Sequence, residues 1–140
     1  MEKNVEVNEA IQAGRDVLHQ ADKVLSYLDD AKLWGIFDLL SDRSFLSGIF
    51  KHSKIDDADR KMNELKYSID RFNVELNDVK VYGEVQQVDI DGFIKFLDIF
   101  CDNFFVDLFT ISKISDSKKR IESLISEVNN IINKLQLIKD

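Results

Sequence analysis

The strongest constraint on the fold is a hydrophobic pattern with a seven-residue period in residues 55–79. Apolar side chains alternate there at steps of three and four, and nearly all side chains between them are polar or charged. The members of this row are Ile55, Ala58, Met62, Leu65, Ile69, Phe72, Leu76 and Val79. Such a row predicts a long amphipathic helix with one apolar stripe. Because a single helix cannot bury its own stripe, the pattern also predicts packing against other helices.

Similar rows predict long helices near both ends of the chain. The N-terminal row contains Ile11, Gly14, Leu18, Ala21, Leu25 and Leu28, and the C-terminal row contains Ile114, Ile121, Leu124, Val128, Ile131, Leu135 and Ile138. Glycine costs up to about 1 kcal/mol of helix propensity relative to alanine. Since Gly14 falls on the apolar stripe, we expect its missing side chain to let a neighbouring helix come close.

The chain of 140 residues fits one domain and contains no proline, which suits uninterrupted helices. We expect an all-α, up-down-up-down four-helix bundle with helices at about 8–33, 53–82, 89–112 and 115–139. Asn8 and Asp89 are the expected N-caps of the first and third helices. The connecting segment 34–52 is too apolar to lie in solvent, so we expect short helical turns that plug one end of the bundle.

Composition excludes several classes of protein. The net charge of −7, from 19 basic and 26 acidic residues, argues against sequence-independent nucleic-acid binding. The most apolar stretch, residues 93–111, contains several charged residues, which argues against a transmembrane segment. Cys101 is the only cysteine, so no internal disulfide can form, and we expect it to act as a small buried apolar residue. With an N-terminus unlike a signal peptide, this predicts a cytoplasmic protein.

Acidic side chains form the polar edge of the third expected helix. Asp91, Asp98 and Asp102 fall on one face, and residues 83–112 contain six acids but a single base. One interpretation is a solvent-exposed edge beside a more basic neighbouring helix. The other is an acidic face that binds a basic partner.

A second candidate site lies at the start of the second expected helix. Lys51, His52, Ser53 and Lys54 are consecutive there, and helix N-termini bind anions through free N–H groups. The alternative is a capped, solvated helix start, with Ser53 as the cap. Trp34 in the preceding segment is either a plug residue or an aromatic anchor for a partner.

Catalytic and cofactor-binding motifs are absent from the sequence. There is no Glu-x-x-His, no Gly-x-Ser-x-Gly and no phosphate-binding glycine loop. We therefore expect no catalytic residues, no metal ligands and no cofactor.

Residues 31–58 resemble a signature of a group of uncharacterised bacterial all-α proteins, which read approximately Trp-Gly-x-x-Asp, then a glycine-rich run, then Lys-His-Ser-Lys-x-x-x-Ala. The matching parts here run from Trp34 to Asp38 and from Lys51 to Ala58, whereas Ser41-Asp42-Arg43-Ser44 replaces the glycine run. The resemblance supplies no activity. It implies that Trp34, Asp38 and the residues from Lys51 to Ser53 belong to one unit.

These observations leave three hypotheses for the function. The first is a non-enzymatic module that binds another protein or a second copy of itself. The second is a bundle that binds a small molecule or anion through residues 34–54. The third is an acidic, immunity-type inhibitor of a toxin.

Overall fold

The computed structural model describes residues 2–29, 54–81, 88–107 and 114–139. These residues form four helices and no strand. The helices are α1 (Glu2–Leu28), α3 (Lys54–Lys80), α4 (Ile90–Asp107) and α5 (Ile114–Leu137). The predicted all-α, four-helix composition is therefore confirmed for the described part of the chain. The expected turns within segment 34–52 lie outside it.

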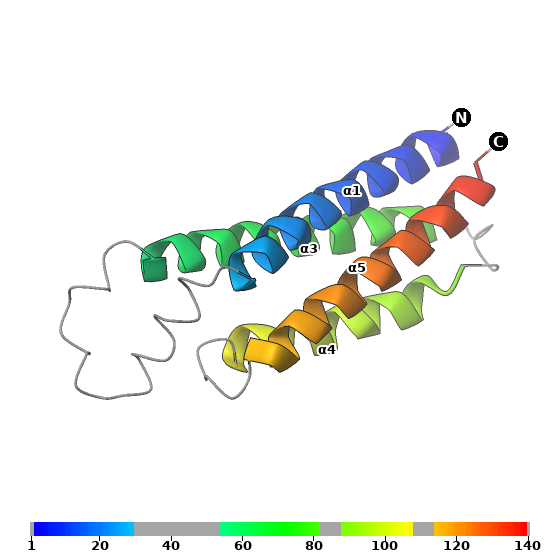
Figure 1. Cartoon of the computed structure of the whole chain (residues 1–140). Coiled ribbons are helices and arrows are strands. Elements are labelled where there is room, and N and C mark those ends of the chain that lie inside the picture. The colour runs from blue at the N-terminus through cyan, green and yellow to red at the C-terminus, as the bar shows by residue number, and fades with distance from the viewer. Residues whose placement is uncertain (1, 30–53, 82–87, 108–113, 140) are drawn as a thin grey trace, which may run out of the picture.

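The helices pack around a common core, with α1 and α4 each in contact with both α3 and α5 (Figure 1). Two ion pairs connect helix ends. Lys80, the last residue of α3, pairs with Asp91 in the first turn of α4. Lys118 in the second turn of α5 pairs with Asp29, which directly follows α1. These contacts are compatible with a four-helix bundle.

The core consists of the apolar rows. Every member of the 55–79 row whose side chain is described is buried, from Met62 to Val79. The ring of Phe72 on α3 meets the ring of Phe93 on α4 edge to face, with centroids 5.5 Å apart. Burying one large apolar side chain stabilises the folded chain by about 1.5–3 kcal/mol, so these rows dominate its stability.

Gly14 lies where α1, α3 and α5 meet, as its place on the stripe predicts. It is buried, and a Cβ atom added to it would lie 3.0 Å from Cδ1 and Cγ1 of Ile132 and 3.0 Å from Cζ of Phe72. Since ordinary van der Waals contacts begin at 3.4 Å, no side chain fits there without displacing a neighbour.

One of the two predicted N-caps is correct. The backbone N–H of Gly92 donates a hydrogen bond of 2.9 Å to Oδ1 of Asp89, so Asp89 caps α4. The prediction that Asn8 caps the first helix is wrong, because α1 begins at Glu2 and Asn8 lies inside it. The physical reason is that the apolar stripe extends to Val7, which is fully buried.

Candidate functional site

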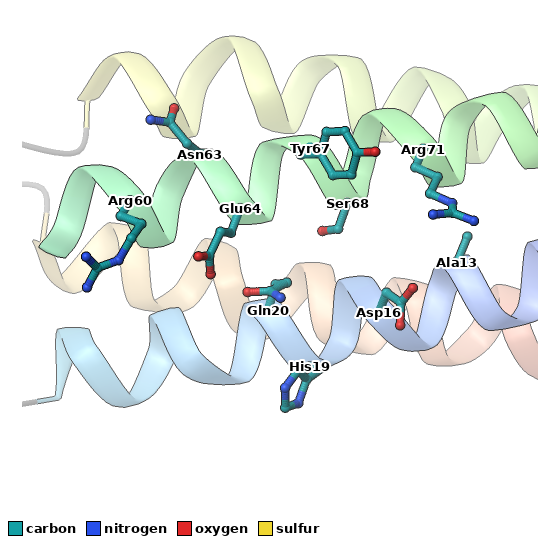
Figure 2. A pocket seen from close by; sticks show the side chains of 10 residues that line it. All are labelled: Ala13, Asp16, His19, Gln20, Arg60, Asn63, Glu64, Tyr67, Ser68 and Arg71. Atoms are coloured by element: carbon teal, nitrogen blue, oxygen red, sulfur yellow. The ribbon is translucent and has the colours of Figure 1, made fainter.

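A groove of about 650 Å³ lies between α1 and α3, and Figure 2 shows the side chains that line it. Those from α1 are Ala13, Asp16, His19 and Gln20, and those from α3 are Arg60, Asn63, Glu64, Tyr67, Ser68 and Arg71. A second hollow of about 610 Å³ shares Arg60 and Glu64 with it and extends to Tyr27. The two hollows therefore form a continuous depression along α1 and α3, which we call the α1–α3 groove.

The groove offers binding groups rather than reactive ones. Its charges are of both signs, with Arg60 and Arg71 opposed by Asp16 and Glu64. The Ser68 hydroxyl is already engaged, because it donates a hydrogen bond of 2.7 Å to the carbonyl oxygen of Leu65 in its own helix. At the far end, the ammonium group of Lys61 lies 5.6 Å from the ring centroid of Tyr27, a cation–π contact that holds both side chains.

A row of exposed apolar side chains lies on the outer side of α3. Tyr67, Val74 and Val81 are 70%, 59% and 80% exposed, and they account for three of the six large, exposed hydrophobic side chains in the described part of the chain. Their seven-residue spacing places Tyr67 and Val74 on one line along α3, with Val81 as the turn residue that directly follows the helix, and the buried stripe occupies the opposite side. We call these three residues the outer row. Tyr67 belongs both to this row and to the groove.

An acidic cluster lies where the start of α1 packs beside the end of α3, near one end of the groove. Carboxylate oxygens of Glu6, Glu75 and Asp78 approach within 4.8 Å of one another. Oε2 of Glu6 and Oε2 of Glu75 are buried and have no hydrogen-bond partner among the described residues.

The electrostatics of this cluster are unfavourable. Loss of hydration raises the pKa of Glu6 and of Glu75, and the nearby charges of Glu9 and Asp78 raise both further. Several carboxylates therefore face one another across α1 and α3. A positive group placed among them would be stabilised, whether a cation or a basic side chain.

The residues predicted as the acidic face, all on α4, are not among the described residues that line this groove. Asp91, Asp98 and Asp102 are exposed on α4, and Asp91 pairs with Lys80. Lys54 is the first residue of α3. The other predicted anion-site residues, Trp34, Asp38, Lys51, His52 and Ser53, lie outside the described residues.

Sequence reasoning missed both the groove and the acidic cluster. The outer row had a readable signal, since Tyr67, Val74 and Val81 repeat at seven residues on the polar side of the helix. The cluster had none, because Glu6 and Glu75 come from different helices and no local spacing brings them together. Only the packing of α1 against α3 creates it.

Cys101 is a half-buried residue of α4. Loss of hydration is the main cause that raises the pKa of its thiol to about 11, and the charge of Asp70 adds to it. The thiol is therefore protonated at neutral pH and unsuited to nucleophilic chemistry.

Comparisons with protein-family models, curated proteins and solved structures give no match to this chain. Within the described residues, no helix combines the length and the apolar character needed to cross a membrane.

Proposed function

We propose that this chain is a non-enzymatic protein–protein interaction module, built as an up-down-up-down bundle, that binds its partner through the face formed by α1 and α3. The observation that carries the proposal is the outer row beside the α1–α3 groove. Three large apolar side chains, two on one line of α3 and one directly after it, cost solvation free energy when they stay in water. Spaced at seven residues between charged side chains, they offer a partner a line of apolar anchor points on one face.

The shape and chemistry of the groove favour a protein over a small molecule. The groove is an open depression rather than an enclosed cavity, and its charges are exposed and of both signs. Tyrosine and arginine, the residues most often dominant in protein interfaces, are both present in Tyr67 and Arg71. A partner surface with apolar anchors between acidic and basic side chains complements this face.

Site-specific photo-crosslinking tests the proposal. A photoreactive phenylalanine analogue replaces Tyr67, and a control replaces Glu122, which is exposed on α5. We expect a crosslinked protein species in cells from position 67 and none from position 122. Equal labelling from both positions, or none from position 67, would contradict a binding role for this face.

The acidic face of α4 supports a second contact surface in the same class of function. Asp91, Asp98 and Asp102 present carboxylates to solvent on one side of the helix. Replacing Asp98 and Asp102 together by asparagine should weaken the binding of a basic partner and reduce its salt dependence. Unchanged binding by this double variant would remove the α4 face from the interface.

The anion-binding alternative remains a prediction, because Trp34, Asp38 and the residues from Lys51 to Ser53 lie outside the described residues. The resemblance of this segment to the uncharacterised bacterial family, the inhibitor hypothesis and the cytoplasmic location are predictions in the same sense. For the anion site, phosphate-bearing ligands should raise Tm, and replacing His52 and Lys54 by alanine should abolish that rise. A flat response across anions and nucleotides would reject it.

A further inference from the structure

The outer row is self-complementary about its central residue. Val74 lies seven residues, or about 10.5 Å along the axis, from Tyr67 on one side, and seven residues from Val81, which directly follows the last residue of α3, on the other. A two-fold axis beside Val74, perpendicular to the helix, places a second α3 antiparallel to the first. Tyr67 then meets Val81 of the second copy, and Val74 meets Val74 of the second copy, so that each contact of this kind occurs in pairs.

The charges beside the row fit the same arrangement. Arg71 and Asp78 are seven residues apart and therefore lie along one edge of the row. Arg71 precedes Val74 by three residues and Asp78 follows it by four, and both side chains are exposed. The two-fold axis keeps each edge of the row opposite the same edge of the second copy. Arg71 consequently comes within about one residue rise, 1.5 Å along the axis, of the level of Asp78 of the second copy.

The opposite edge of the row is compatible with this register as well. Asp70 and Asn77 lie there, again seven residues apart and both exposed. The same axis brings Asp70 within about one residue rise of the level of Asn77 of the second copy. The Asn77 amide already donates to the carbonyl oxygen and to Oδ1 of Asn73, and because it is uncharged it places no like charge opposite Asp70.

The acidic cluster strengthens the pairing of Arg71 with Asp78 in this register. Asp78 is the exposed member of that cluster, and the carboxylates of Glu6 and Glu75 add negative charge within 4.8 Å of it. The guanidinium of Arg71 from the second copy arrives at this position with several N–H donors. The apolar contacts and the negative charge centred on the exposed Asp78 therefore favour the same docking geometry.

We propose that the partner of the α1–α3 face is a second copy of this chain, docked antiparallel along the outer row with its two-fold axis at Val74 and with Arg71 of each copy in the acidic cluster of the other. This inference rests on the proposed function, because it names the partner of the same face.

Charge reversal and its rescue test the pairing. Light scattering across a range of concentrations gives the solution mass of the wild type, of Arg71→Asp, of Asp78→Arg and of the double variant. We expect a wild-type dimer, a loss of dimer affinity of at least about tenfold in each single variant, and recovery in the double variant. Val74→Asp should give a monomer, whereas Leu137→Asp, at an exposed apolar residue of α5, should leave the dimer intact.

Circular dichroism checks that each variant is folded. All five variants change exposed side chains, so each should retain the helix content of the wild type. A monomeric wild type, a dimer that survives Val74→Asp, or a double variant without recovery would overturn the inference. A monomer that still crosslinks another protein from position 67 would overturn the inference and leave the proposed function standing. A monomer without any crosslink would remove both.

A divalent cation is the other possible occupant of the acidic cluster, and the same samples distinguish it. If Mg²⁺ or Ca²⁺ raised the Tm of a monomeric wild type and Glu75→Gln removed that rise, the cluster would be a cation site and the proposed pairing with Arg71 would be wrong.

Discussion

Replacing Gly14 by alanine tests whether the close approach of three helices at this residue limits the stability of the fold. At an open helical position, this substitution stabilises a protein by about 1 kcal/mol through helix propensity. Here the new methyl group would lie 3.0 Å from Ile132 and from Phe72. Phe72 is fully buried and Ile132 is 5% exposed, so neither side chain can move into solvent to make room.

Overpacking of a core costs about 1–3 kcal/mol. After the gain in propensity is subtracted, we expect the Gly14→Ala variant to lose about 1 kcal/mol of unfolding free energy in urea denaturation. For a chain of this length, that corresponds to a fall in Tm of about 3 °C. Gly14→Ala should leave the far-UV circular dichroism spectrum unchanged.

The Ile132→Ala background supplies the matched control, because it removes both Ile132 atoms that the methyl group would meet and leaves space beside the remaining contact, Cζ of Phe72. In that background, Gly14→Ala should be neutral or stabilising, with a favourable coupling of about 1 kcal/mol in the double-mutant cycle. If Gly14→Ala raised the unfolding free energy of the wild type, the close approach of α1 to α3 and α5 would be refuted.

Three further predictions concern single groups. In the Val74→Asp background, Glu75→Gln should raise the unfolding free energy at pH 7. The folded-state pKa of Glu75 is raised, so its ionisation as pH rises through that pKa destabilises the folded chain, and glutamine cannot ionise. The gain should vanish in urea denaturation near pH 4, and a gain independent of pH would contradict the prediction. At pH 8, iodoacetamide should alkylate Cys101 at least about tenfold more slowly in the folded protein than in urea, and equal rates would contradict the raised thiol pKa. Asp89→Ala should cost about 1 kcal/mol of unfolding free energy through loss of the α4 cap, while Asp98→Ala on the same helix should change it by less than about 0.5 kcal/mol.

The helices and their buried faces were predictable because each is encoded locally. The row from Met62 to Val79 needs only the helical period to place it in the core, and Asp89 needs only its position before an apolar run to act as a cap. Gly14 was informative for the same reason, since its place on the stripe requires a close neighbour. The start of α1 was missed because Asn8 is a strong cap type, and the burial of Val7 outweighs that local preference.

The candidate site was harder to predict because it depends on which helices become neighbours. The spacing of the outer row can be read from the sequence alone. Its interpretation as part of a binding face depends on the α1–α3 groove beside it, which only the structure shows. Glu6 and Glu75 have ordinary surroundings in the sequence, and their buried, unpaired oxygens arise from packing between two helices that are distant in the chain. Tertiary contacts of this kind have no signature in local spacing.

Disulfide trapping at the two-fold axis is the most direct test of the account. In a Cys101→Ser background, Val74→Cys places one thiol per copy at the position where the outer row meets itself. Mild oxidation should convert this variant rapidly to a covalent dimer on a non-reducing gel, and Leu137→Cys in the same background should remain monomeric. Equal and slow crosslinking of the two variants would show that the outer row does not meet a second copy of itself.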